Sequence, residues 1–303
     1  MRRARAACTF PRSIFARLLF RPRSILAPAQ ALAPSTTCSS SKTAVRSTRS
    51  RASDTIPAMN EARGHIHPIS SLVRETNRIF FDMGFTFAEG PLLESEWYNF
   101  DALNVPKDHP ARDMQDTFFV KGEQGYVLRT HTSPVQVRYM EAQAKKGNPP
   151  PYRVIVPGKV FRNEATDMTH EAEFFQIEGF AVGEDVSLAH LKGTLERFFR
   201  ELFKGAGAEI RFRPSFFPFT EPSVEVDMRI TGKRVPDKLR DKWIEMMGAG
   251  MVHPNVLRNA GIDSEKYQGF AFGMGLDRLA MLRWGIDDIR LMHSADLRFI
   301  NQF

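Results

Sequence analysis

Cysteine is scarce in this sequence and confined to one end. The 303 residues include two cysteines, Cys8 and Cys38, and both lie within the first 60 positions. The rest of the chain therefore has no thiolate for a disulfide framework or a thiolate metal site. No HExxH, GxSxG or GxxxxGK[ST] string occurs and the eight histidines are scattered, so zinc-hydrolase, serine-hydrolase and P-loop chemistry find no support. No apolar run is long enough to cross a bilayer, and we expect no membrane partner.

A basic excess is also missing from most of the chain. Residues 1–60 hold eleven Lys/Arg and one acid, Asp54, a net charge of +10, whereas the whole sequence carries +7. Residues 61–303 therefore carry about −3 by difference. This larger part has no bulk positive charge of the kind that indicates nucleic-acid binding, so any RNA contact must be local or must use a partner.

The charge asymmetry divides the chain into a predicted disordered basic leader, residues 1–60, and one domain, residues 61–303. The leader is rich in Arg, Ser, Ala and Pro and lacks the composition of a packed core. Three interpretations are open: an organelle transit peptide, a disordered basic arm, or an upstream extension with Met59 as the true start. Because residues 1–58 lack apolar periodicity, we expect the domain to fold without them.

Helical and strand patterns follow one another in the domain without regular βαβ alternation. Apolar residues at helical spacing predict helices at 69–83, where Gly84 stops the pattern, and at 187–204. Strands are expected at 117–120, 126–129, 209–213, 224–229 and 243–247, with turns at SFFPFTEPS and at the Gly-rich GAGMVHPN. The order of these elements favours an α+β fold with a mainly antiparallel sheet flanked by helices.

The stretch VIVPGKVFRNEATDMTHEAEFFQIEGFAV, residues 154–182, predicts an antiparallel hairpin around a long loop. Period-2 alternation places Phe175 on one face and Phe174, Gln176 and Glu178 on the other. Arg162 and Glu164 are expected to join the second group. A guanidinium beside carboxylates and an amide suits a triphosphate, a metal and an amino group. The alternative is a hairpin with a solvated charged face.

Two further strings admit both a structural and a functional interpretation. In THTSPVQ, Ser133 is expected as an N-cap, with Gln136 completing a capping box. In GMGLDR, two glycines precede Arg278 at the start of a predicted helix, a position suited to phosphate. The alternative for Arg278 is an exposed helix arginine. The third glycine of a dinucleotide fingerprint is absent.

These strings together resemble the class II aminoacyl-tRNA synthetases. FRNE with its hairpin is similar to motif 2, GMGLDR to motif 3, and the helix and strand ending at Pro91 to motif 1. NFDALNVPKDHPARDMQDTF, FPFTEP and GFAFGMGLDRLAMLR resemble the α-subunit family of bacterial two-subunit phenylalanyl-tRNA synthetases. The resemblance runs from about residue 65 to the end. It implies a class II catalytic core that joins L-phenylalanine to ATP and transfers the acyl group to tRNA(Phe).

The resemblance also implies roles for individual residues. The expected catalytic residues are Arg162, Arg278 and His170. ATP is expected at Arg162, Glu164, Phe174 and Arg278. L-Phenylalanine is expected at His131, Ser133, Gln136, Gln176, Glu178, Phe217, Phe219, Ala249 and Ala271. Mg²⁺ accompanies ATP, and Glu221 is the expected metal position.

Partners and compartment follow from the same resemblance. A β-subunit in an α₂β₂ tetramer is implied, with motif 1 at a subunit interface. The bacterial form implies the cytoplasm, and a mitochondrial or plastid matrix follows if residues 1–58 are a transit peptide. Residues 1–64 lack heptads for the family's N-terminal coiled-coil arm. Two alternatives compete with this function: a same-fold ligase for another substrate, such as a phosphoseryl-type enzyme, and a non-catalytic binding subunit.

Overall fold

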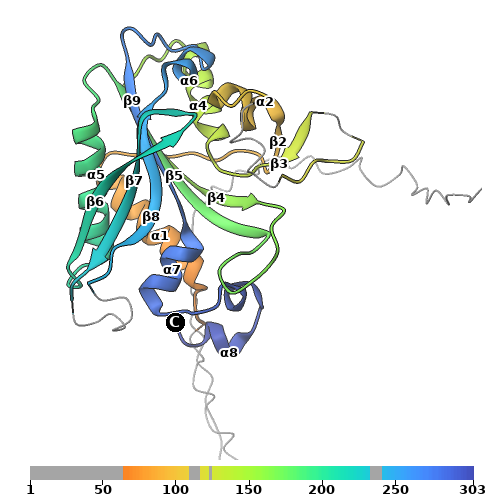
Figure 1. Ribbon diagram of the computed structural model, residues 1–303, viewed down its shortest axis with the longest axis vertical. Helices are drawn as coiled ribbons and strands as arrows, with labels where there is room; N and C mark the ends of the chain where they lie inside the picture. Colours follow the sequence, from red (N-terminus) through yellow and green to blue (C-terminus); the bar gives the residue numbers. More distant parts are fainter. Residues whose placement is uncertain (1–63, 109–116, 123–124, 233–240) are drawn as a thin grey trace, which may run out of the picture. The chain divides into compact units, whose positions relative to one another are not determined.

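The computed structural model describes residues 64–108, 117–122, 125–232 and 241–303. Within them, a seven-stranded sheet has the order β1-β4-β5-β9-β8-β7-β6 (Figure 1). Its neighbours are antiparallel except β1 and β4, which confirms the α+β prediction. The strands are β1 (Thr86–Phe87), β4 (Tyr152–Phe161), β5 (Glu173–Gly183), β6 (Ala208–Phe217), β7 (Thr220–Ile230), β8 (Ile244–Val252) and β9 (Gln268–Gly275). The leader predicted at residues 1–60 lies outside the described residues.

One face of the sheet packs against three helices, α1 (Pro68–Phe81), α5 (Leu188–Leu202) and α7 (Leu276–Trp284) (Figure 1). Phe80 of α1 is fully buried and stacks on Phe198 of α5 and Phe272 of β9, with ring centroids 4.8 and 5.4 Å away. Burying a phenyl group stabilises a fold by about 1.5–3 kcal/mol. This aromatic cluster therefore anchors the helices to the middle of the sheet.

The opposite face is covered only in part. The helices α4 (Pro134–Lys145) and α6 (Pro254–Asn259) and the 3₁₀ turn η1 (Asp101–Leu103) lie over it, and Phe180 and Val182 of β5 are buried beneath them. Gln176 and Glu178 share this face because side chains alternate along a strand. The polar end of β5 is therefore left free to line a cavity.

Helix α1 confirms the helix predicted at 69–83. Its buried side includes Ile69, Leu72, Ile79 and Phe80, as the apolar spacing requires. Among the features that start it, Nδ1 of His67 accepts a hydrogen bond from the amide of Ile69 at 3.2 Å. The predicted stop is also present, since Gly84, three residues after the helix ends at Phe81, has a φ of +80°.

The region between α1 and α4 contains more regular structure than the sequence predicts. A small second sheet pairs β2 (Leu93–Ser95) with β3 (Tyr126–Leu128), and the helical turns α2 (Glu96–Asn99) and η1 follow β2. The strand expected at 117–120 is wrong, because only Phe119 forms an isolated bridge, to Val127. Part of the intervening sequence, residues 109–116 and 123–124, lies outside the described residues.

Strands β6, β7 and β8 are longer than predicted. The expected turn SFFPFTEPS is almost entirely strand, and the chain reverses only between Phe217 and Thr220. Likewise the expected Gly-rich turn after residue 247 continues β8 to Val252. Glycine fits there because a Cβ on Gly250 would lie 2.5 Å from the carbonyl oxygen of Pro222. Of the helices described, none has both the length and the hydropathy that a membrane span needs.

Candidate active site

The hairpin predicted at 154–182 forms as β4 and β5. The two strands pair antiparallel from Tyr152 opposite Val182 to Phe161 opposite Glu173, and residues 162–172 connect them. Ile177 is fully buried on the helix-covered face, whereas Gln176 and Glu178 line a cavity on the opposite face. The predicted hairpin and the alternation of its two faces are therefore confirmed, whereas the functional role of the cavity-lining face stays a prediction.

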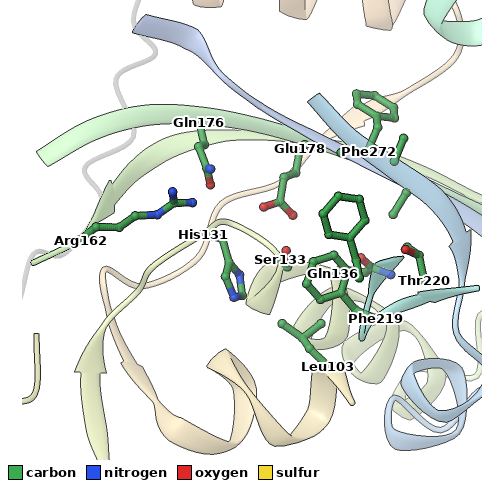
Figure 2. Close-up of a pocket in the computed structure, with 15 residues that line it drawn as sticks. Leu103, His131, Ser133, Gln136, Arg162, Gln176, Glu178, Phe219, Thr220 and Phe272 are labelled. Atoms are coloured by element: carbon green, nitrogen blue, oxygen red, sulfur yellow. The ribbon is translucent and has the colours of Figure 1, made fainter. Parts of the chain in front are cut away.

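The cavity has a volume of about 220 Å³. Figure 2 shows side chains from the hairpin, the start of α4, the β6–β7 turn and β9 converging on it. It gathers Arg162 and the nine residues that the resemblance assigns to phenylalanine: His131, Ser133, Gln136, Gln176, Glu178, Phe217, Phe219, Ala249 and Ala271. Their roles as ligands stay predictions, but the fold does bring these distant positions to one place.

One half of the cavity is polar, with Glu178 at its centre. The Oε1 atom of Glu178 accepts a hydrogen bond from the amide of Thr132 at 3.1 Å. Burial raises the pKa of Glu178, and hydrogen bonds from Ser133 and Thr132 and the charge of Arg129 oppose that rise. Oε1 of Gln176 is buried and has no hydrogen-bond partner among the described residues. An acceptor left unpaired costs about 1–3 kcal/mol, which a donor on a ligand would recover.

His131 enters the same half as a neutral imidazole. Burial, with the positive charge of Arg162 next in effect, lowers the pKa of His131 to about 3. Its Nδ1 atom is buried and finds no hydrogen-bond partner in the described part of the chain. The ring therefore offers hydrogen bonding without adding a positive charge, which suits a site that receives an ammonium group.

The capping box expected at Ser133 and Gln136 does not form. Helix α4 begins at Pro134, but Ser133 already has helical angles, φ −56° and ψ −29°, and its side chain caps no helix amide. An N-cap needs an extended backbone to turn its oxygen toward the first turn. The Ser133 hydroxyl instead bonds Glu178, and both side chains face the cavity (Figure 2).

The other half of the cavity is apolar and aromatic. The rings of Phe217 and Phe219 lie parallel, with an interplanar angle of 7° and centroids 5.9 Å apart. Ser223 holds the turn between them, since its Oγ accepts a hydrogen bond from the amide of Phe217 at 3.0 Å and lies 2.7 Å from the carbonyl oxygen of Thr220. The stacked rings are thus fixed by backbone contacts on both sides of Pro218.

Five lining residues are absent from the sequence prediction: Leu103, Thr220, Gly248, Phe272 and Gly273. The glycines carry a signal in retrospect, because each sits in a strand interior where a Cβ would collide. On Gly248 it would lie 2.7 Å from Phe217 Cζ, and on Gly273 2.9 Å from Glu178 Cγ. Period-2 alternation also places Gly273 on the same face as Ala271. Leu103 has no local signal, because its 3₁₀ turn reaches the cavity only through the tertiary fold.

Three of the four residues predicted for ATP, Arg162, Glu164 and Phe174, form a group at the edge of the cavity. The Arg162 guanidinium lies 5.1 Å from the centroid of the Phe174 ring, and its Nη1 is 3.8 Å from Oε1 of Glu164. Burial lowers the pKa of Arg162, and Glu164 and then Glu178 counter that effect. A partly dehydrated guanidinium beside an open aromatic face can bind phosphate while the ring stacks on a base.

His170 and Arg278 do not line the cavity. His170 lies in the β4–β5 loop, with its side chain 55% exposed and Nδ1 3.0 Å from Oδ2 of Asp167. Arg278 is exposed in the first turn of α7. That turn is tied to the hairpin, because Oδ2 of Asp277 accepts a hydrogen bond from the amide of Phe175 at 2.6 Å. This hydrogen bond joins the sequence neighbours of Arg278 and Phe174, so it ties the backbone next to Arg278 to the backbone next to Phe174.

The predicted metal position, Glu221, also lies outside the cavity. Its side chain is 76% exposed, with Oε2 3.4 Å from Nε2 of His253. Among the described residues, no three His, Cys, Asp or Glu side chains cluster as metal ligands would. Mg²⁺ commonly keeps several waters and uses one or two carboxylates plus substrate phosphates. A single exposed carboxylate fits a magnesium ion of that kind and does not form a dedicated protein cage.

Comparison with known proteins identifies the family of this chain. The profile of the family described as tRNA synthetases class II core domain (F) matches residues 53–303. The phenylalanine–tRNA ligase alpha subunit of Geobacillus kaustophilus is 53% identical over 252 residues, covering 82% of this chain and 72% of its own length. That of Dechloromonas aromatica is 50% identical over 258 residues, covering 82% and 73%. The chain therefore belongs to the class II tRNA synthetase family and, within it, to the phenylalanine–tRNA ligase alpha subunits.

Proposed function

We propose that this chain is the catalytic subunit of a phenylalanine–tRNA ligase. It joins L-phenylalanine to ATP, forming phenylalanyl-adenylate and pyrophosphate, and then transfers the acyl group to tRNA(Phe). The observation that carries the proposal is one cavity with an aromatic half, at Phe217 and Phe219, and an anionic half, at Glu178, next to the arginine of the ATP group. The ring of an aromatic amino acid matches the aromatic half and its ammonium group matches the anionic half. Its carboxylate then stays free to react with ATP.

The polar half holds the substrate's ammonium group in this proposal. The carboxylate of Glu178 supplies the negative charge, and Oε1 of Gln176 is an unused acceptor. His131 is neutral because burial and the charge of Arg162 keep its pKa at about 3, so it does not repel the ammonium. Ser133 and Gln136 complete the polar wall. These fixed groups orient the amino acid before the reaction, which lowers the entropic part of the barrier.

The apolar half takes the phenyl ring. Phe217 and Phe219 would contact it edge-to-face, a geometry that aromatic quadrupoles favour. Ala249 and Ala271 supply small walls, which limits the depth available to a para substituent. Arg162 is the one cation among the residues that line the cavity, and it lies at the polar half. An anionic side chain such as phosphoserine would meet no counter-charge in the aromatic half, which disfavours the same-fold ligase for another substrate.

Adenylate formation needs charge stabilisation more than a base. A carboxylate oxygen of phenylalanine bonds to the α-phosphorus of ATP, and the bond from that phosphorus to the bridging oxygen breaks to release pyrophosphate. Arg162 stabilises the charge at the α-phosphate, Glu164 and Phe174 hold the adenine, and Arg278 and His170 meet the remaining phosphates. Mg²⁺ bound with ATP would screen the phosphate charge, and Glu221 is the residue of this chain that would hold a magnesium ion.

A β-subunit is the proposed partner, because the relatives are named alpha subunits. We propose an α₂β₂ tetramer with α1 and β1 at a subunit interface. Phe81 and Phe87 support this, since these residues are 74% and 49% exposed although both are large and apolar. Scattering and activity measurements on the purified protein test the assembly. A fully active monomer would contradict it.

Amino-acid-dependent ATP–pyrophosphate exchange tests the function itself. The full chain is co-purified with its β-subunit and assayed with phenylalanine, tyrosine, phosphoserine or no amino acid. We expect exchange with phenylalanine at a rate well above the other three. Exchange with phosphoserine would favour the alternative ligase, and no exchange with any amino acid would favour the non-catalytic subunit. The cytoplasm and an organelle matrix remain the two proposed compartments, which localisation of the tagged full chain separates.

A further inference from the structure

The residues after α7 fold back along the ATP side of the site. This C-terminal segment, residues 285–303, contains the 3₁₀ turn η2 (Ile289–His293) and the helix α8 (Leu297–Ile300), and lies beside α7 below the β4–β5 hairpin (Figure 1). The amide of Ile289 donates to the carbonyl oxygen of Met168 at 3.0 Å, which holds the β4–β5 loop. The segment thus touches the loop that carries the predicted phosphate contact His170.

The C-terminal segment is linked to the site by an ion pair between His293 and Asp277, the residue before Arg278. Nε2 of His293 lies 2.9 Å from Oδ1 of Asp277, whose residue is only 1% exposed. The other oxygen of the same carboxylate accepts the amide hydrogen of Phe175 at 2.6 Å. One buried carboxylate therefore joins η2, the first turn of α7 and the start of β5.

The neighbours of these contacts are the residues proposed to bind ATP. Arg278 follows Asp277 directly, and Phe174 precedes Phe175 directly. A shift of Asp277 must therefore move the backbone that carries the arginine and the backbone that carries the aromatic ring. Misplacement of about 1 Å can cost roughly 100-fold in rate when catalysis depends on positioning.

We propose that His293 is a positioning residue for the ATP side of this site. By holding Asp277 it fixes Arg278 and Phe174, and through η2 it restrains the β4–β5 loop. The inference rests on the proposed function, because it assumes that these residues meet ATP. His293 itself touches no substrate in this proposal and acts through Asp277.

The charges around His293 give the contact a pH dependence. The hydrogen bond and charge of Asp277 raise the pKa of His293, and Glu171 and Glu173 add to the rise. His67, the N-cap residue of α1, also approaches η2, with Nε2 2.9 Å from the carbonyl oxygen of Met292. Because the folded pKa is raised, the ionic part of the contact is complete below the ordinary histidine pKa of about 6.5 and is lost as pH rises through the raised value.

Steady-state exchange kinetics on the complex with the β-subunit test the proposal. The variants are His293→Ala, His293→Gln, which keeps a side-chain N–H donor, and His190→Ala as a control on α5. We expect His293→Ala to raise the ATP KM by about tenfold while the phenylalanine KM changes less than about twofold, as for loss of a charge-assisted hydrogen bond. In the wild type we expect the ATP KM to rise as pH increases above about 6.5, and His293→Gln should recover most of the ATP KM and abolish that rise. His190→Ala should match the wild type.

A second measurement does not depend on activity. Amide hydrogen exchange is compared between wild type and His293→Ala for peptides covering residues 162–176 and, as an internal control, α5. We expect faster exchange in the hairpin peptides, because the amide of Phe175 loses a fixed acceptor, and unchanged exchange in α5. Unchanged exchange throughout, or ATP and phenylalanine KM values that rise together, would overturn the proposal. If the wild type lacks phenylalanine-dependent pyrophosphate exchange, the proposed function fails. The amide hydrogen-exchange data still decide whether His293 positions the hairpin.

Discussion

Replacing Gly248 with alanine tests how the aromatic half of the cavity is built. Gly248 lies in β8 under the ring of Phe217. An added Cβ would lie 2.7 Å from Cζ and 2.9 Å from Cε2 of that ring. Carbon atoms in good contact stand about 3.5–4.0 Å apart, so the ring must withdraw by nearly 1 Å. Because Phe217 lines the cavity and stacks on Phe219, the ring's withdrawal changes the space that receives the substrate.

The size of the effect follows from overpacking. Forcing one extra carbon into a packed site costs about 1–3 kcal/mol. If phenylalanine can bind only when Phe217 returns, that energy appears in its kcat/KM as a loss of roughly 5- to 150-fold. The three atoms nearest to the added Cβ all belong to the Phe217 ring and not to the ATP group at Arg162 and Phe174, so the ATP KM should stay unchanged. Para-chlorophenylalanine should lose more than phenylalanine, since a displaced ring leaves less room.

Pyrophosphate exchange and thermal melts on the complex distinguish this effect from general damage. Gly193→Ala is the matched control, because Gly193 lies in helix α5 with no atom within 4 Å of an added Cβ. Alanine there should stabilise the helix by about 0.5–1 kcal/mol and leave exchange kinetics as in the wild type. Unchanged phenylalanine kinetics in Gly248→Ala would refute the reasoning, and so would parallel losses for phenylalanine and ATP.

Four other expectations follow from the site and the sequence. Ala271→Gly should admit para-chlorophenylalanine and reduce discrimination against tyrosine, whose unpaired hydroxyl costs about 1–3 kcal/mol in the wild type, and unchanged substrate ratios would contradict it. Arg162→Ala and Arg278→Ala should each remove about 2–5 kcal/mol of transition-state stabilisation from adenylate formation. A fall in the rate of adenylate formation of less than about tenfold in both variants would exclude their assignment. Because burial keeps the pKa of His131 near 3, stability should fall by up to about 1.4 kcal/mol per unit as pH drops below about 6.5, and His131→Asn should flatten that slope in denaturant titrations. A chain starting at Met59 should melt and pair with the β-subunit as the full chain does, and a lower melting temperature would contradict this.

Local patterns in the sequence determine much of the fold. The spacing of apolar residues was enough to predict the helices α1 and α5, since an amphipathic helix buries the face on which its apolar residues recur. Period-2 alternation sufficed for the β4–β5 hairpin and placed Gln176 and Glu178 on the cavity face. The antiparallel class followed from the order of elements, because hairpin-type links join strands that run in opposite directions.

Long-range pairing decided where local signals conflict. SFFPFTEPS and GAGM contain turn-forming residues, yet they extend β6, β7 and β8. Partners across the sheet satisfy their backbone groups, and the glycines fit where a ring or a carbonyl comes too close for a Cβ. The same conflict explains Ser133, whose local sequence favours a cap while the tertiary fold turns its hydroxyl to Glu178.

The chemistry of the site divides in the same way. Residue types and their resemblance to a family name the nine side chains proposed for phenylalanine, because each sits in a recognisable string. Only the tertiary structure brings Leu103 and Thr220 to the same cavity, and only it pairs Asp277 with His293 across a turn. The physical reason is that a sequence pattern reports which face of an element is buried, whereas contact between elements depends on how several faces pack at once.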